Sequence, residues 1–338
     1  MSCLLVLAAA LSVAACGGGS DTRKAGPGPA PGPAPTVSQS IPVGGSPAAV
    51  AAGLGGVWVA DNLRGRLVRV APDTRRVAGH AAAGNGPIAV AVGSGAVWVA
   101  GADSTVRRYD SRTGVATGEP ERVPDPGGVA VGEGSVWVTS RTSGTVTRLD
   151  PNTGRRRGRV IKVGPEPTDI AVGGGGVWVA NSKQMNGTVS RIDPKSGTAG
   201  KPIKVAKEQV LALTFGENGV WVATTDEVRG DKIEVERIDP GSSRPEGDIV
   251  RLDRPGLPVR LAAGAGAVWV AQAGGTGIGA GASSGTVARL DPTRRRRVGA
   301  AVRLPGPPAG VSVGESGVWV ATSGTGELVR VGPADGTN

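Results

Sequence analysis

Seven copies of the tripeptide Val-Trp-Val recur along this 338-residue chain at intervals of about 40 residues, and they contain every tryptophan in it. Each tryptophan follows a glycine by five positions and an aliphatic residue by eight, and six of the seven follow a proline by eleven. The seven are Trp58, Trp98, Trp137, Trp178, Trp221, Trp269 and Trp319. A period near 40 residues with glycine turns and alternating apolar residues is typical of the blades of a β-propeller. The repeat therefore predicts an all-β, seven-bladed ring.

Each repeat divides into four short strands. The first runs from the proline to the glycine, as at residues 167–173, and the second contains the Val-Trp-Val segment. Glycine, asparagine or serine stands three positions before each tryptophan, which suits a tight hairpin between these two strands. A third strand follows, as at Gly144–Asp150, and a turn leads from it to an outer strand such as Arg159–Val163. We therefore expect four-stranded antiparallel blades.

The two ends of the repeat array complement each other. The seventh repeat ends after its third strand, Leu328–Val331, and a turn, so it has no outer strand of its own. The segment Thr36–Val43 reads like the segments that precede the later repeats. We predict that this N-terminal strand completes the last blade and closes the ring, which would remove two open sheet edges. The propeller is thus expected to span residues 36–338.

The residues before the propeller read as an export signal and a tether. Residues 4–15 form a largely apolar run of 12 residues, too short to span a bilayer and suited to a signal peptide. The run ends in Val-Ala-Ala-Cys16-Gly, which resembles the lipobox of bacterial lipoproteins, where the matching cysteine carries the lipid. We predict a signal peptide at 1–15, lipidation at Cys16 and a Gly/Pro-rich tether at 16–35. The protein would be exported and anchored to the outer surface of the bacterial cytoplasmic membrane.

The fourth repeat carries a resemblance to a known family. Residues 167–181 read Pro-x-x-Ile-Ala-Val-Gly-x-Gly-x-Val-Trp-Val-Ala-Asn, and residues 187–194 read Gly-Thr-Val-Ser-Arg-Ile-Asp-Pro. This pattern resembles the repeat of the streptogramin B lyase (virginiamycin B lyase) group and of the related YVTN propellers of bacterial envelopes. The resemblance implies a seven-bladed propeller. For the lyase group it also implies an elimination reaction that uses a catalytic histidine and Mg²⁺ held by glutamates at one mouth of the ring.

The histidine content argues against that activity. The chain has one histidine, His80, which the repeat places on the outer strand of the first blade, away from the axis. We therefore expect a non-enzymatic binding or protein-interaction module of the cell envelope, without a metal or other cofactor. The alternative is a metal-dependent lyase or hydrolase that uses Mg²⁺ and in which a carboxylate such as Asp169 or Glu208 replaces the histidine as the base.

A candidate ligand site emerges where side chains break the repeat. Nine positions before each tryptophan, which we call the inner-strand position, five blades carry alanine or glycine, but blades four and six carry Asp169 and Arg260. The loops between the second and third strands also lengthen over blades four to six, and loops on a rigid scaffold commonly bind ligands. The predicted ligand-binding residues are Asp169, Gln209, Arg260, Asn181, Lys183, Asp226 and Glu227. The alternative is a salt bridge or solvated rim without a ligand.

Arginine runs explain much of the formal net charge of +10. They follow the turn between the third and the outer strand, on the face where the N-terminal strand should begin. The predicted basic surface consists of Arg155, Arg156, Arg157, Arg294, Arg295, Arg296 and Arg297. Since the lipid tether would leave the same face, we expect contact with anionic lipid or a wall polymer, the alternative being exposed turns without a partner. We expect a monomer that binds no nucleic acid, because no surplus aromatic residues remain for stacking on bases.

Overall fold

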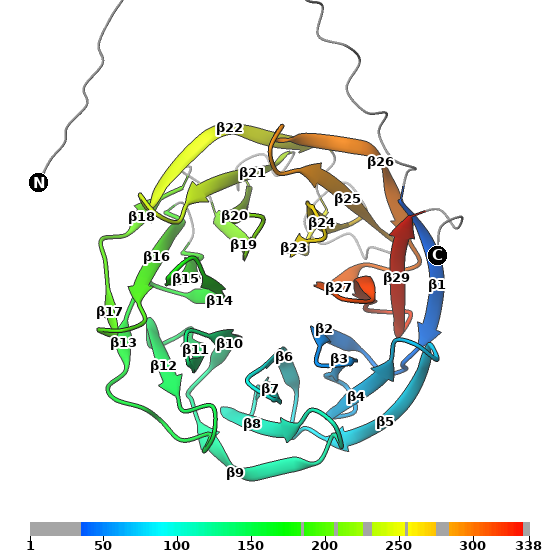
Figure 1. Cartoon of the computed structure of the whole chain (residues 1–338), viewed down its shortest axis with the longest axis horizontal. Helices are drawn as coiled ribbons and strands as arrows, with labels where there is room; N and C mark the ends of the chain where they lie inside the picture. The colour runs from blue at the N-terminus through cyan, green and yellow to red at the C-terminus, as the bar shows by residue number, and fades with distance from the viewer. Residues whose placement is uncertain are drawn as a thin grey trace, which may run out of the picture. The chain divides into compact units, whose positions relative to one another are not determined.

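The computed structural model describes residues 35–183, 186–205, 209–225, 232–253, 256–274 and 284–333. These residues belong to one compact unit, Pro33–Asn338, and form seven antiparallel sheets arranged as blades around a central axis (Figure 1). The prediction of a seven-bladed β-propeller is therefore confirmed. The predicted signal peptide, Cys16 and all but the last residue of the tether lie outside the described residues. No helix in the described ranges is long and apolar enough to cross a membrane.

Within each blade, the strands lie side by side in chain order from the axis outwards, except that β1 forms the outer strand of the last blade. The innermost strands are β2 (Pro47–Gly53), β6 (Pro87–Gly93), β10 (Pro126–Gly132), β14 (Pro167–Gly173), β19 (Gln209–Gly216), β23 (Val259–Gly264) and β27 (Pro308–Gly314). The second strands are β3 (Gly56–Asp61), β7 (Ala96–Gly101), β11 (Ser135–Ser140), β15 (Gly176–Asn181), β20 (Gly219–Thr225), β24 (Ala267–Ala273) and β28 (Gly317–Thr322).

The remaining strands form the outer half of each blade. The third strands are β4 (Arg66–Ala71), β8 (Thr105–Asp110), β12 (Thr145–Leu149), β16 (Thr188–Asp193), β21 (Lys232–Asp239), β25 (Gly285–Asp291) and β29 (Glu327–Pro333). The outer strands are β5 (Arg76–Ala82), β9 (Ala116–Arg122), β13 (Ile161–Lys162), β17 (Thr198–Ala199) with β18 (Ile203–Lys204), β22 (Arg244–Asp253), β26 (Arg296–Leu304) and β1 (Pro35–Pro42).

Two outer strands are shorter than the sequence suggested. In blade three the predicted strand Arg159–Val163 is reduced to β13, and the segment before it touches β12 only at an isolated bridge from Leu149 to Arg156. Between these contacts Gly158 takes a φ of 78°, a left-handed conformation that interrupts regular strand pairing. In blade four the outer strand is split into β17 and β18, both of which pair with β16.

The Val-Trp-Val motif builds the contacts between blades. Each tryptophan is at most 6 % exposed and packs against the two motif valines of the next blade, as Trp58 does against Val97 and Val99. The same arrangement recurs around the ring and closes with Trp319 on Val57. Residues alternate between the two faces of a strand, so one tripeptide gives a tryptophan to one neighbour and two valines to the other. Each motif therefore contributes to the interfaces on both sides of its blade.

The third-strand arginines cover the tryptophan rings. In every blade an arginine of the third strand pairs in register with the tryptophan of the second strand, as Arg148 does with Trp137. In five blades the guanidinium carbon lies 4.9–5.9 Å from the ring centre, within the range of a cation–π contact. Arg69 also donates a hydrogen bond of 2.8 Å to the carbonyl of Arg112 in the next blade. These arginines thus strengthen the interfaces between blades.

An aspartate at the end of the third strand fixes the turn to the outer strand. Asp150 is typical, because its Oδ1 accepts hydrogen bonds from the N–H groups of Asn152 and Thr153 at 2.9 and 3.0 Å. Such N–H donors hold the pKa of this carboxyl below its usual value, since they stabilise the charged form. The pKa is lowered in the same way in Asp110, Asp193, Asp239 and Asp291. The turn therefore has the same geometry in several blades, and the arginines that follow it are exposed to solvent, as Arg155 and Arg294 are.

The N-terminal strand closes the ring as predicted. β1 pairs antiparallel with β29, and the strand order of this blade is β1, β29, β28 and β27. Pro35 lies opposite Pro333 and Pro42 opposite Glu327, so β1 begins at the end of the blade where the other blades have their turn into the outer strand. The first and last described segments of the chain therefore share one sheet (Figure 1).

Candidate functional site

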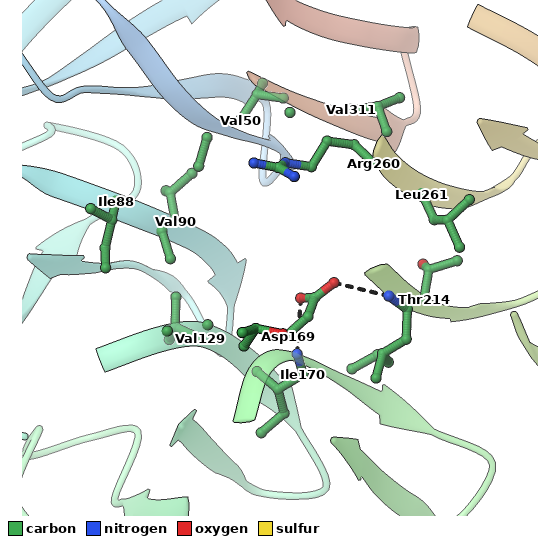
Figure 2. Close-up of a pocket in the computed structure, with 18 of the residues that line it drawn as sticks. Val50, Ile88, Val90, Val129, Asp169, Ile170, Thr214, Arg260, Leu261 and Val311 are labelled. Atoms are coloured by element: carbon green, nitrogen blue, oxygen red, sulfur yellow. Dashed lines mark hydrogen bonds between the residues drawn. The ribbon is translucent and has the colours of Figure 1, made fainter. Parts of the chain in front are cut away.

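A cavity of about 370 Å³ lies at the axis of the ring, at the end where the inner strands begin. All seven inner strands contribute to its wall. Most of the lining side chains are small or aliphatic, among them Val50, Val90, Val129, Ile170, Leu213, Leu261 and Val311 (Figure 2). Its volume lies within the range of about 300–1,000 Å³ that is typical of ligand pockets.

Among the described residues that line this cavity, Asp169 and Arg260 are the only ones with charged side chains. They come from β14 and β23, two blades apart, and both occupy the inner-strand position where the other five blades carry alanine or glycine. Figure 2 shows both side chains reaching into the cavity. The structure therefore brings together the two residues that break the repeat, while their role in ligand binding remains a prediction.

Hydrogen bonds to the main chain of two blades hold the Asp169 carboxylate. Its Oδ1 accepts the N–H of Ile170 at 2.9 Å, and its Oδ2 accepts the N–H of Leu213 on β19 at 3.0 Å. The residue is half-buried, because its side chain faces the cavity. Burial raises the pKa of Asp169, against the opposing effects of the two N–H donors and of Arg260. The carboxylate thus links blades four and five at the cavity.

Arg260 is held in a corresponding way on the other side. Its Nε donates a hydrogen bond of 2.8 Å to the carbonyl of Ala309 in the next blade, and its Nη1 donates one of 3.0 Å to the carbonyl of Val259. Burial lowers the pKa of Arg260, and the charge of Asp169 opposes that shift. A guanidinium stays protonated in proteins at neutral pH, so the cavity contains a positive group opposite the carboxylate that accepts the two N–H groups.

The other predicted residues that the structure describes do not line the cavity. Asn181 is fully buried inside blade four, where its Nδ2 donates to the hydroxyls of Thr188 and Ser190 at 3.1 and 3.0 Å. Gln209 begins β19 opposite Thr225 and does not reach the cavity wall. Lys183 is exposed and lines a separate surface groove. Asp226 and Glu227 lie outside the described residues.

Two threonines of the cavity wall were not predicted. Thr168 and Thr214 lie ten and seven positions before the tryptophans of their repeats, where the other blades carry apolar residues, glycine or, once, serine. The hydroxyl of Thr168 lies 2.6 Å from that of Ser182, which in turn donates a hydrogen bond of 2.6 Å to the carbonyl of Val210. Both threonines therefore differ from the residues at the matching positions of most other repeats, but a small hydroxyl side chain departs from that pattern less clearly than a charged one.

The described cavity residues do not fit a Mg²⁺ site of the kind that the lyase resemblance implies. Mg²⁺ takes oxygen ligands in an octahedral arrangement, yet Asp169 is the single carboxylate in the described wall, and the positive charge of Arg260 shares the cavity. No group of three or more His, Cys, Asp or Glu residues in the described ranges could hold a metal. His80 lies on β5, exposed and paired with Val68, as the sequence predicted.

Nearby carboxylates neutralise part of the predicted basic surface. Guanidinium nitrogens of Arg155 and Arg156 lie 3.9 and 4.0 Å from carboxylate oxygens of Glu121. The corresponding nitrogen–oxygen distances are 3.0 Å from Arg294 to Asp291 and 3.7 Å from Arg295 to Glu246. Among the described residues Arg157, Arg296 and Arg297 form no ion pair. The arginine turns follow third strands, and β1 begins at that same end of the blades.

These features define a seven-bladed β-propeller with a charged axial cavity, and the comparison with known proteins supports the fold. Similar solved structures include hydrazine synthase of Kuenenia stuttgartiensis (15 % identity, TM-score 0.69, covering 86 % of this chain and 96 % of that one). The WD40 repeats of RRP9 (9 %, 0.67, 89 % and 99 %) and U3-55K (9 %, 0.65, 86 % and 93 %) are also similar. No protein-family model and no curated protein matches the sequence. At these identities the likeness shows the fold alone.

Proposed function

We propose that this protein is a non-enzymatic binding or interaction module of the bacterial cell envelope, exported and membrane-anchored, whose ligand occupies the axial cavity. The observation that carries the proposal is the pair Asp169 and Arg260, which stands among uncharged side chains in the described cavity wall at the two inner-strand positions that break the repeat. Burying a charge is costly. Exceptions to a repeat that carry such a cost are expected at functional sites.

The non-enzymatic part of the proposal rests on what the cavity offers chemically. Its described wall has no histidine, cysteine or serine, and the single carboxylate is engaged by two N–H groups. A binding role needs only that the two charges are held in place, and their main-chain hydrogen bonds provide this. The lyase or hydrolase alternative, with Asp169 as the base, needs a second group to stabilise developing charge, and Arg260 is the only cation in the described wall.

Thermal unfolding in the presence of ligand tests this function. We expect the small-molecule fraction of an envelope extract to raise the Tm of the purified propeller by about 5 °C near saturation, because a ligand that binds only the folded state stabilises it. The Asp169→Asn variant should lose this shift, whereas Asp103→Asn, which changes a surface carboxylate paired with Arg107, should keep it. Turnover of a lactone or depsipeptide with Mg²⁺ that Asp169→Ala abolishes would instead favour the enzyme alternative.

Membrane attachment is proposed to use both Cys16 and the arginine turns, because the tether would reach β1 at the end of the blades that carries those turns. We expect Cys16→Ala to release the protein from membranes into the soluble fraction. The released protein should still bind vesicles rich in anionic lipid, and Arg155→Gln with Arg156→Gln and Arg157→Gln should weaken that binding by about tenfold at low salt. Equal binding to neutral vesicles would contradict the second step, and a Cys16→Ala protein that stays on membranes would contradict the first.

A further inference from the structure

The axial cavity combines two opposite charges with an apolar wall. Apart from Asp169, Arg260 and the hydroxyls of Thr168 and Thr214, its side chains are aliphatic or absent. Asp169 and Arg260, both within the described ranges, form no ion pair, which would require a nitrogen and an oxygen within 4.0 Å of each other. Figure 2 shows the two side chains apart, with open space between them. The cavity can therefore accept a ligand between the charges.

Both charged groups keep hydrogen-bonding capacity on the side that faces the cavity. Arg260 uses Nε and Nη1 for carbonyl groups of the wall, which leaves the N–H groups of Nη2 for a ligand. Each oxygen of Asp169 accepts one main-chain N–H, and a carboxylate oxygen can accept a second donor. The guanidinium thus presents donors to an anionic group, and the carboxylate presents acceptors to a cationic one.

Charge balance decides between the kinds of ligand that such a cavity could hold. A simple anion would satisfy Arg260 but add a second negative charge beside Asp169, and a simple cation would repel Arg260 in the same way. Because the other side chains of the described wall are uncharged, an additional charge in the cavity that lacks a group of opposite charge beside it is unfavourable. A neutral apolar ligand would give neither group a partner of opposite charge. A molecule that carries both charges satisfies each group and keeps the net charge unchanged.

We propose that the cavity binds a small zwitterion with an apolar side chain, of the kind represented by a free aliphatic α-amino acid. Its carboxylate would accept from Arg260, its ammonium group would donate to Asp169, and its side chain would contact the aliphatic wall formed by residues such as Val90, Val129 and Leu261. This inference rests on the proposed binding function and names the chemical class of its ligand. The volume of about 370 Å³ has room for a molecule of this size together with a few water molecules.

Isothermal titration calorimetry of the full-length protein with L-leucine and its two half-analogues tests the proposal. Isocaproate has the carboxylate and side chain of leucine without the ammonium group, and isoamylamine has the ammonium group and side chain without the carboxylate. We expect leucine or another aliphatic amino acid to bind, and each half-analogue to bind at least about 30-fold more weakly, because it leaves one buried charge unpaired. This comparison uses the wild-type protein and so does not depend on how a variant folds.

Two variants assign the charges to their partners. Asp169→Asn should weaken amino-acid binding and remove the preference for leucine over isocaproate, whereas Arg260→Lys should weaken the binding of leucine and isocaproate alike. Asp103→Asn serves as the control, because that carboxylate pairs with Arg107 and does not line the axial cavity. Circular dichroism at the titration temperature confirms that each variant is folded.

The possible outcomes separate this inference from the function on which it rests. Half-analogues that bind as tightly as leucine, or no binding of any aliphatic amino acid at millimolar concentration, would overturn the zwitterion proposal. If the envelope fraction still raises the Tm in a manner that depends on Asp169, the binding function stands and only the ligand class is wrong. If neither the amino acids nor the envelope fraction stabilises the protein, both proposals fail.

Discussion

A chain that begins at Gly44, and therefore lacks β1, is expected to lose the cooperative thermal transition of the full protein at temperatures near 37 °C. Removal of β1 leaves β29 as an open sheet edge. It also deletes Ile41, a side chain that is 3 % exposed in the core between the last and first blades. It also deletes the N–H of Val43, which donates to the carbonyl of Gly326 at 2.9 Å. An uncovered edge with a hydrophobic face favours association with other chains. We therefore expect aggregation, measured by light scattering, together with loss of the transition in circular dichroism.

Two controls make the ring-closure prediction specific. Deleting residues 17–34 should leave the Tm unchanged, because the strand that closes the ring begins at Pro35 and is kept. The milder Ile41→Ala variant should reduce the free energy of unfolding by about 2–5 kcal/mol, the usual cost of truncating a buried aliphatic side chain. A synthetic peptide of residues 35–43 added to the truncated chain should restore the transition. A truncated chain that is monomeric with an unchanged Tm would show that the ring is closed by blade packing alone.

Repetition explains how much of this fold could be predicted from one sequence. A single Val-Trp-Val segment is ambiguous, but seven in a fixed register with proline, glycine and arginine leave few arrangements that bury every tryptophan. Closure by β1 followed from the missing strand of the last repeat. The outer strands were less predictable because they lie at the rim, where each pairs with the third strand of its blade alone. There a local feature such as the left-handed Gly158 decides whether pairing continues.

The candidate site was predictable only where a side chain broke the repeat at a position facing the axis. Asp169 and Arg260 met that condition. Asn181 did not, because it follows the tryptophan by three positions, where the side chain turns into the blade. Asp61 and Thr322 occupy the same position in other blades and are also fully buried. The sequence shows that a residue is unusual for its repeat, but the strand register determines whether it faces a cavity or the interior of a sheet.

Replacing Trp137 by alanine is expected to lower the free energy of unfolding by about 3–5 kcal/mol, the usual cost of truncating a buried tryptophan. The ring is fully buried against Val177 and Val179 of blade four, and Arg148 lies 4.9 Å from its centre. Its Nε1 donates a hydrogen bond of 3.1 Å to the carbonyl of Gly132, which closes the hairpin behind it. Urea unfolding followed by circular dichroism measures the change, because the signal does not depend on the tryptophan removed.

The same experiment separates packing between blades from hydrophobic content in general. Leu63→Ala removes a side chain that is 75 % exposed, so it should change the free energy of unfolding by no more than about 0.5 kcal/mol. Val177→Ala removes a direct partner of Trp137 across the blade interface, so the double variant should be less destabilised than the sum of the two single variants. Additive effects would mean that the two side chains stabilise their own blades independently. A non-additive result would establish that the Val-Trp-Val repeat stabilises the ring through contacts from one blade to the next. Those contacts fix the blades relative to one another and so hold Asp169 and Arg260, which come from different blades, in one cavity.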